Sequence, residues 1–269
     1  MSDARSPLTV QDLRERKAKG ERVVALTCYD VLFARLLDES GVDILLVGDS
    51  VNQVLAGAET TLSATLDQMI YHTKSVRRGT ERALVICDMP FLTYQVSREE
   101  AIRNCGRVLA ETGCHGVKLE GGQPIAETTR ALVDAGIPVM GHLGLTPQSV
   151  HALGGYRVQG RDEAGAERLQ QDATALEAAG VFAIVLELIP APLASRITKS
   201  LAIPTIGIGA GPACDGQVLV LHDLLGLNDR FNAKFVKRYA TLAQDVREAV
   251  ELFAAEVREG RYPGPEHSF

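Results

Sequence analysis

Short runs of branched aliphatic residues alternate along this chain with longer segments in which apolar residues recur every three or four positions. The short runs lack strict apolar-polar alternation, which is typical of parallel strands buried on both faces. The longer segments have the period of amphipathic helices. The pattern predicts eight strands, at residues 23–26, 44–47, 83–88, 116–120, 137–141, 182–187, 204–208 and 218–221.

Segments of helical period separate most of these strands. We expect helices at residues 9–19, 29–37, 66–76, 97–113, 124–133, 166–176, 190–197 and 228–259. Eight alternating units in a chain of this length favour a closed (β/α)8 TIM barrel, as a single domain over residues 1–269, with an N-terminal helix and a long C-terminal helix. The seventh unit departs from the pattern, because only residues 210–217 lie there.

Composition narrows the class of protein. With 269 residues and 46% hydrophobic residues, the chain can bury one large core. A formal charge of -6, with scattered Lys and Arg, argues against a nucleic-acid partner. Five cysteines without metal-ligand spacing indicate buried thiols in a reducing compartment. No apolar signal core and no membrane-length apolar run occur, so we expect a soluble, cytoplasmic protein with no membrane partner.

Carboxylates stand at the ends of four predicted strands: Asp49, Asp88, Glu120 and Glu187. In a barrel, the carboxyl ends of the second, third and fourth strands lie side by side on the catalytic face. Three hard oxygen donors without Cys or His favour Mg2+, with Asp49, Asp88 and Glu120 as ligands. The alternative is three independent helix caps or salt bridges.

Three further residues are candidates for chemistry at that face. Lys118 lies two residues before Glu120, so both side chains point the same way, and Lys118 could neutralise a substrate carboxylate or a developing enolate. A structural ion pair is the alternative for this lysine. Glu187, on the sixth strand, is placed to act as the general base. His142 could orient substrate or share proton transfer, although a lone histidine is more often only hydrogen-bonded in place.

Two glycine-rich segments follow predicted strands. Residues 207–211 follow the seventh strand, where barrels often bind phosphate, but these glycines could equally serve a shortened turn. Residues 142–161 have little regular period and a composition suited to a lid or a subunit contact. Residues 50–65 form another long connection, and connections of that length are often functional.

Several short blocks together resemble the ketopantoate hydroxymethyltransferase family. They occur in the family's order and span nearly the whole chain. The blocks are TCYD at 27–30, VGDS at 47–50, DMPF at 88–91, VKLEGG at 117–122, GHLGLTPQ at 141–148 and IGIGAG at 206–211.

The resemblance implies a (β/α)8 fold and transfer of a hydroxymethyl group from 5,10-methylenetetrahydrofolate to 3-methyl-2-oxobutanoate. The product would be 2-dehydropantoate, in pantothenate biosynthesis. It also implies Mg2+, a large homo-oligomer of the homodecamer kind, and residue roles carried over by motif. In these roles Asp49, Asp88 and Glu120 surround the metal, Asp49, Ser50, Asp88 and Lys118 contact the keto acid, and Glu187 accepts the proton.

Chemistry worked out from the residues agrees with this implied reaction. A cation chelated by a 2-oxo acid acidifies the adjacent carbon by stabilising the enolate, and a nearby carboxylate can remove the proton. A second enzyme class is a Mg2+-dependent carbon-carbon lyase of the phosphoenolpyruvate mutase and isocitrate lyase type, although the Lys-Lys-Cys-Gly-His stretch of that group is absent. A third possibility is a non-catalytic barrel scaffold, in which the strand-end acids are caps.

Overall fold

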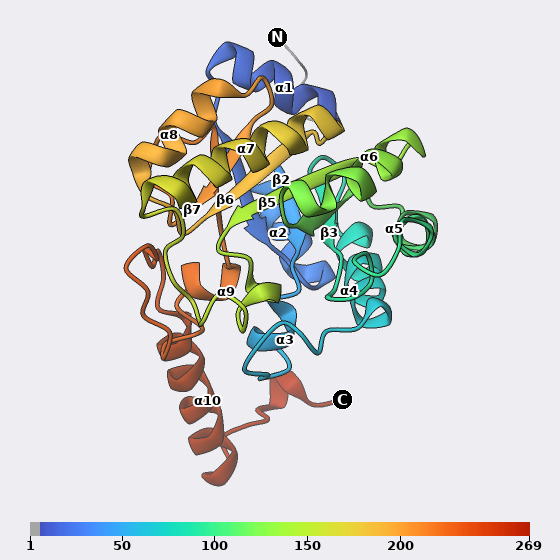
Figure 1. Cartoon of the computed structure of the whole chain (residues 1–269). Coiled ribbons are helices and arrows are strands. Elements are labelled where there is room, and N and C mark those ends of the chain that lie inside the picture. Colours follow the sequence, from blue (N-terminus) through green and yellow to red (C-terminus); the bar gives the residue numbers. More distant parts are fainter. Residues whose placement is uncertain (1–5) are drawn as a thin grey trace. The chain divides into compact units, whose positions relative to one another are not determined.

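The computed structural model of the chain describes residues 6–269, and eight parallel strands form a closed ring within it. Each strand pairs with its neighbours in sequence, and β8 closes on β1. Figure 1 shows the labelled strands with helices packed outside them. The predicted (β/α)8 barrel is confirmed. The strands are β1 (Val23–Thr27), β2 (Ile44–Val47), β3 (Leu84–Asp88), β4 (Gly116–Glu120), β5 (Val139–Gly144), β6 (Ala183–Glu187), β7 (Thr205–Ile208) and β8 (Gly216–Leu219).

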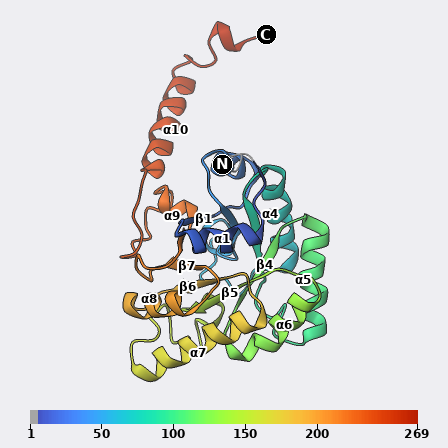
Figure 2. The ribbon, with the colours of Figure 1, turned by 90° about the horizontal axis from the view of Figure 1, so that it is seen from above.

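Helices follow the strands and surround the ring (Figure 2). The shortened seventh unit is confirmed, because β7 is followed by β8 without a helix between them. The connection at 50–65, expected as a loop, contains one short helix, α3. The helices of this part are α1 (Val10–Lys19), α2 (Val31–Glu39), α3 (Val51–Val54), α4 (Leu66–Arg78), α5 (Arg98–Thr112), α6 (Ala126–Asp134), α7 (Glu163–Ala179) and α8 (Ala191–Ser200), with 3-10 turns η1 (Gln123–Ile125) and η2 (Pro147–Ser149).

Helix α1 closes the amino end of the barrel, where it lies across the ring in Figure 2. Its Leu13 is fully buried in the cluster of aliphatic side chains that fills the interior. Lys17 Nζ donates to the carbonyls of Thr198 (2.8 Å) and Ile203 (2.9 Å) and pairs with Asp215 (3.0 Å). Helix α1 and its contacts therefore close the amino end of the barrel. The candidate site lies at the opposite, carboxyl end.

Strand β5 differs from its predicted range of 137–141. It starts later because the Ile137 N–H still bonds to the Leu132 carbonyl at the end of α6, and Pro138 has no N–H to donate. It continues through Gly144, which is in register with Glu187 of β6. His142 therefore lies within β5 and not at its end.

Contacts divide the chain into two compact units, Met1–Val220 and Leu221–Phe269, and the first contains all eight strands. The second unit contains α9 (Leu221–Leu224), α10 (Leu242–Arg258) and η3 (Pro265–His267). The predicted long C-terminal helix is present, but its predicted start at 228 was wrong. Residues 228–241 form turns, in which Arg238 donates to the carbonyls of Asp229 (3.1 Å) and Phe231 (2.7 Å). Asn and Asp side chains favour such turns over helix. The single domain over 1–269 stays a prediction.

Candidate active site

Asp49, Asp88 and Glu120 come together at the carboxyl ends of β2, β3 and β4. They are only 4%, 3% and 5% exposed. The Asp49 N–H donates to Asp88 Oδ2 (3.1 Å), and Gln148 donates to both Asp49 Oδ2 and Glu120 Oε2 (each 3.0 Å). The barrel thus brings into one buried cluster three acids that are far apart in sequence.

Lys118 lies among these acids. Its Nζ is 2.9 Å from Asp88 Oδ1, 3.9 Å from Glu120 Oε1 and 3.1 Å from His142 Nδ1. Burial opposes the charge of this lysine, but Asp88 and Glu120 outweigh it and raise the pKa of Lys118 above its ordinary value. The ion pair considered from the sequence is therefore present, and it also places a fixed positive charge inside the cluster.

His142 connects the cluster to Glu187. Its Nε2 is 3.2 Å from Glu187 Oε2, and its Nδ1 is 3.4 Å from Glu120 Oε1. Burial and Lys118 disfavour the imidazolium, but the carboxylates of Glu120 and Glu187 outweigh them and raise the pKa of His142 to about 9. The Glu187 side chain is 16% exposed, against 2% for that of Glu120, so Glu187 is the more accessible carboxylate.

The cluster and Glu187 together bring four carboxyl groups next to two basic groups, Lys118 and His142. Burial, followed by repulsion from Asp88 and Glu120, raises the pKa of Asp49 to about 8. Burial also raises the pKa of Asp88, although Lys118 opposes the change. The pKa of Glu120 is lowered, because His142 and Lys118 together outweigh its burial. A cation would relieve the repulsion that remains.

Ser50 lies close to Asp88 because Gly48, which follows strand β2, has no side chain between them. A Cβ at Gly48 would be 2.7 Å from Ser50 Oγ and 3.6 Å from Asp88 Oδ2. The Ser50 hydroxyl is 2.8 Å from the hydroxyl of buried Tyr29. Ser50 therefore lies near the acids, and its contact with the keto acid stays a prediction.

Two residues that hydrogen-bond to the acids of the site were not predicted from the sequence. Gln148 comes from the connection after β5, and Tyr94 comes from the connection after β3. The Tyr94 hydroxyl accepts the Glu120 N–H (3.1 Å) and donates to Gln148 Oε1 (2.9 Å). Gln148 ends the GHLGLTPQ block, but nothing in the sequence indicates that its side chain reaches Asp49.

Within residues 6–269, no three His, Cys, Asp or Glu side chains form a ready-made metal-ligand group. In that part of the chain the buried Glu120 Oε1 has ion-pair partners, with His142 Nδ1 at 3.4 Å and Lys118 Nζ at 3.9 Å. Carboxylate oxygens are the ligands that a hard cation prefers. The acids therefore fit Mg2+ in donor type, burial and charge.

The glycines at 207–211 support the turn interpretation. Gly209 and Gly211 have φ of 62° and 82°, and a Cβ at Gly211 would lie 2.5 Å from Ala191 Cβ. A larger side chain at Gly211 would therefore be strained.

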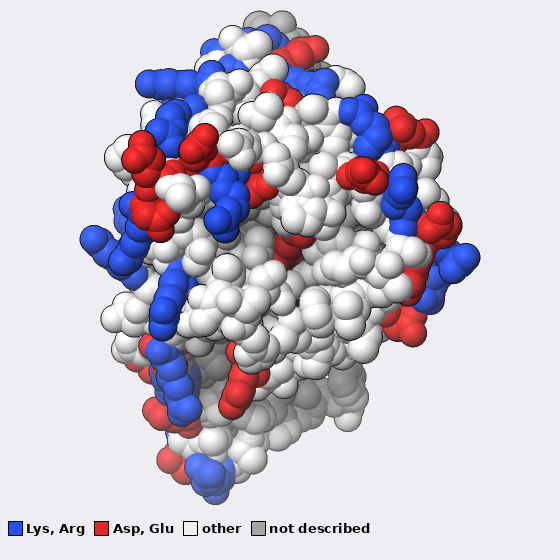
Figure 3. Space-filling model, viewed as in Figure 1, with Lys and Arg blue, Asp and Glu red and all other residues white. Residues whose placement is uncertain are grey.

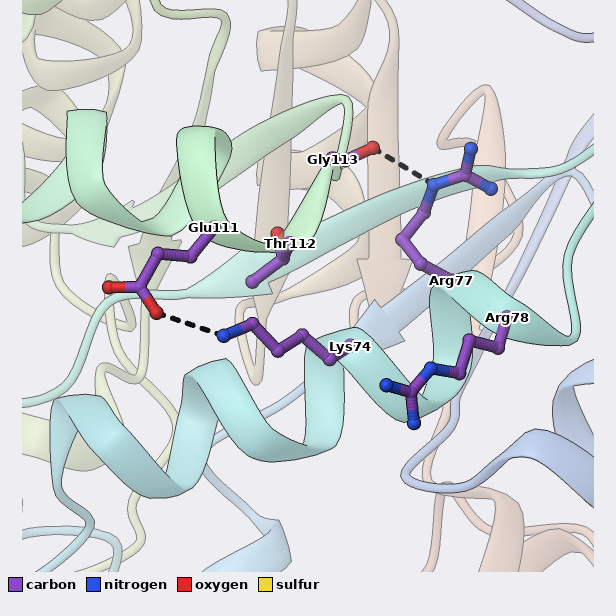
Figure 4. A pocket seen from close by; sticks show the side chains of 6 residues that line it. All are labelled: Lys74, Arg77, Arg78, Glu111, Thr112 and Gly113. Carbon is purple, nitrogen blue, oxygen red and sulfur yellow. Dashed lines mark hydrogen bonds and ion pairs between the residues drawn. The ribbon is translucent and has the colours of Figure 1, made fainter.

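A surface pocket between α4 and α5 holds no strand-end acid (Figure 4). In it Lys74 pairs with Glu111 (2.9 Å), and Arg77 donates to the Gly113 carbonyl (2.9 Å).

Lys and Arg are interspersed with Asp and Glu on the face shown in Figure 3. No helix in residues 6–269 has both the length and the apolar character needed to cross a bilayer.

Comparison with known proteins gives one consistent family. The family model described as ketopantoate hydroxymethyltransferase matches residues 7–265. A protein of Pelobacter propionicus named 3-methyl-2-oxobutanoate hydroxymethyltransferase is 55% identical over 269 residues, covering 100% of both chains. A protein of the same name from Moorella thermoacetica is 56% identical over 265 residues, covering 98% of each.

Solved structures show the same fold at low identity. A phosphonopyruvate hydrolase in complex with oxalate and Mg++ has a TM-score of 0.64 at 13% identity, covering 97% of this chain and 93% of its own. A 2,3-dimethylmalate lyase of the PEP mutase/isocitrate lyase superfamily has a TM-score of 0.62 at 17% identity, with the same coverage. By its sequence, its barrel and its relatives, this chain belongs to the ketopantoate hydroxymethyltransferase family and is an enzyme of the transferase class.

Proposed function

We propose that this enzyme transfers a hydroxymethyl group from 5,10-methylenetetrahydrofolate to 3-methyl-2-oxobutanoate, forming 2-dehydropantoate. The observation that carries the proposal is the placing of the partly exposed Glu187 beside a buried cluster of three acids and one lysine. The name of the close relatives supports the keto acid and the transferred group. The folate donor follows from the family resemblance.

Asp49, Asp88 and Glu120 would hold Mg2+ in this proposal. Burial of Asp49, followed by repulsion from Asp88 and Glu120, raises the pKa of its carboxyl group, and a cation would offset both effects. Bound at this site, the cation would withdraw electron density from the keto acid oxygens and so acidify the adjacent carbon. The Mg++ complex of phosphonopyruvate hydrolase, which has the same fold, is consistent with this assignment.

The cluster residues other than the base would bind and orient the keto acid. Lys118, held 2.9 Å from Asp88, would compensate the substrate carboxylate and the charge that develops as the enolate forms. Ser50 would donate a hydrogen bond from a hydroxyl that Tyr29 already orients at 2.8 Å. Asp49 and Asp88, which lie together in the cluster, would contact the keto acid as well.

Glu187 would remove the proton from C3 of the keto acid. His142 Nε2, 3.2 Å from Glu187 Oε2, would orient the carboxylate and stabilise its charge before transfer. The methylene carbon is bonded to two folate nitrogens, and water would add to it as both carbon-nitrogen bonds break, which gives a one-carbon aldehyde and tetrahydrofolate. The C3 enolate would then form a carbon-carbon bond to the aldehyde carbon, and the aldehyde oxygen would take up a proton. Because a hydroxymethyl group contains an oxygen that a methylene group lacks, water must supply the hydroxyl.

Deuterium exchange tests this assignment without folate. Enzyme in D2O with Mg2+ and 3-methyl-2-oxobutanoate should exchange the C3 proton, as followed by NMR, because enolisation precedes transfer. Glu187→Gln keeps the side-chain shape but removes its basicity, so exchange should fall by about 10²- to 10⁴-fold while keto acid binding survives. Undiminished exchange in Glu187→Gln would move the base to another residue. A lyase or an inert scaffold would leave the proton in place.

We also propose a homo-oligomer, with the homodecamer suggested by the resemblance as its form. Helix α10 buries none of its residues, and Val250, Leu252 and Phe253 on it are 59%, 60% and 52% exposed. Apolar side chains in such number on one helix favour association. Sedimentation at the monomer mass across micromolar concentrations would contradict this.

A further inference from the structure

Gln148 belongs to the 3-10 turn η2, in the connection between β5 and α7, and its residue is 5% exposed. We propose that Gln148 is a positioning residue, which binds one carboxylate oxygen of Asp49 and one of Glu120 and so orients the other oxygen of each toward the divalent cation. This inference rests on the proposed function, because it assigns a role toward the cation of that site. It concerns a residue that contacts neither the keto acid nor the metal in the roles assigned above.

Every polar atom of the Gln148 side chain is hydrogen-bonded. Nε2 donates to Asp49 Oδ2 (3.0 Å) and to the Met89 carbonyl (2.9 Å). Oε1 accepts from the Tyr94 hydroxyl (2.9 Å) and from Gln95 Nε2 (3.3 Å). The opposite amide orientation would set Oε1 against two acceptors, so the contacts determine which end faces Asp49.

The backbone of the same residue holds the second acid. Pro147 opens the η2 turn and has no N–H, so the Gln148 N–H is among the first that the turn leaves without an internal partner. It donates to Glu120 Oε2 (3.0 Å). One residue therefore holds two acids that come from strands β2 and β4.

The hydrogen bonds leave the other oxygens available. Gln148 donates to Oδ2 of Asp49 and to Oε2 of Glu120, whereas Glu120 Oε1 lies on the side of His142 Nδ1 (3.4 Å) and Lys118 Nζ (3.9 Å). Because an amide is neutral, it orients both carboxylates without cancelling their charge. A lysine or arginine at this position would compete with the cation for the same charge. Partners of ligating carboxylates of this kind set metal affinity.

The connection that carries Gln148 is itself held in place near its two ends. The Leu145 N–H donates to the Glu187 carbonyl (2.8 Å), and the Gln159 N–H donates to the Leu188 carbonyl (2.9 Å). Gln148 is thus presented from a segment anchored on β6, so its amide is preorganised toward the acids.

Binding of Mn2+, counted by the EPR signal of the free ion, tests the inference. Gln148→Met keeps the length of the side chain and removes the amide, so the dissociation constant for Mn2+ should rise by about 10- to 100-fold. Gln159→Met is the matched control, because it makes the same change in the same segment, where the amide bonds only to the Arg157 carbonyl (2.9 Å). The control should bind Mn2+ within about twofold of the unmutated enzyme.

A second measurement separates positioning from a loss of structure. In Gln148→Met, the Mg2+ concentration for half-maximal C3 proton exchange should rise by the same factor, while the rate at saturating Mg2+ stays within about threefold. Gln148→Ala, which cannot clash, replaces the methionine variant if that variant does not fold. Equal Mn2+ affinity in the unmutated enzyme and a folded Gln148 variant would overturn the inference and leave the proposed function intact. Failure of the unmutated enzyme to bind Mn2+ or Mg2+ would instead overturn the metal site, and this role with it.

Discussion

The two ends of the barrel both bury charged side chains, but they balance them differently. At the amino end, Asp43 is 2% exposed and pairs with Arg16 (2.9 Å) and Arg82 (2.7 Å) while accepting the Val24 N–H (3.0 Å). At the carboxyl end, three buried acids share Lys118 and His142.

This difference separates stability from chemistry. A buried carboxylate surrounded by cations and N–H donors is satisfied by its own protein and has no capacity left for a ligand. At the carboxyl end, burial and after it the negative charge of Asp88 and Glu120 raise the pKa of Asp49. A residual charge of that kind is typical of a site that a cation and a substrate complete.

Removal of divalent cations should have the largest effect on the carboxyl end. Exhaustive chelation should lower the rate of 2-dehydropantoate formation by at least about 10³-fold, because acidification of the keto acid depends on the cation. Mg2+ should restore the rate. The unfolding midpoint of the chelated enzyme should stay high, since the amino-end pairs contain no metal. Full turnover after chelation would contradict this expectation, because it would show that the carboxyl-end acids, like Asp43, do not depend on a cation.

Substitution of Asp43 should break the amino end instead. Asp43→Asn leaves Arg16 and Arg82 without their anion, and the free energy of unfolding should fall by about 3 kcal/mol. The rate of the folded enzyme should change little. Glu15→Gln is the control, because Glu15 pairs with Lys19 while both are over 60% exposed, and its cost should be below about 0.5 kcal/mol. Urea unfolding measures both variants, and equal small costs would contradict the contrast.

Substitution of Ser50, at the carboxyl end, should have a smaller effect on keto acid affinity. Ser50→Ala removes one substrate hydrogen bond, worth about 1 kcal/mol or roughly fivefold in keto acid affinity. Asp88→Ala should instead abolish binding of both metal and keto acid, since Asp88 also pairs with Lys118. Calorimetric titration distinguishes them, and equal small effects would remove Asp88 from the metal site.

The smallest effect concerns an exposed cap on the helix that seals the amino end. The Thr9 side chain and N–H donate to Asp12 Oδ2 (each 2.7 Å), and these bonds lower the pKa of Asp12. Since the folded-state pKa is depressed, this stabilisation is present at neutral pH and is lost as the pH falls through that pKa, below about 4. Asp12→Asn should therefore cost under about 1 kcal/mol at pH 7 and nothing at pH 2. A pH-independent difference in the unfolding midpoint would show that charge plays no part.

The sequence by itself determined the barrel and the sites of its acids. Short apolar runs without alternation, separated by segments of helical period, favour buried parallel strands, and parallel strands place their carboxyl ends on one face. Asp88, Glu120 and Glu187 end their strands as predicted, and Asp49 follows its strand by two residues. The ends of the helix predicted at 97–113 are also confirmed, because Ser97 and Gly113 cap α5.

Tertiary structure alone decided what those acids touch. Gln148 and Asp49 are 99 positions apart, and no periodicity or motif relates them. The range of β5, and with it the place of His142 between Glu120 and Glu187, depended on pairing with β4 and β6. Turns at 228–241 overrode a helical period in the same way. Local patterns report which face a residue takes, whereas hydrogen-bond partners are set by the approach of distant segments, which no single segment encodes.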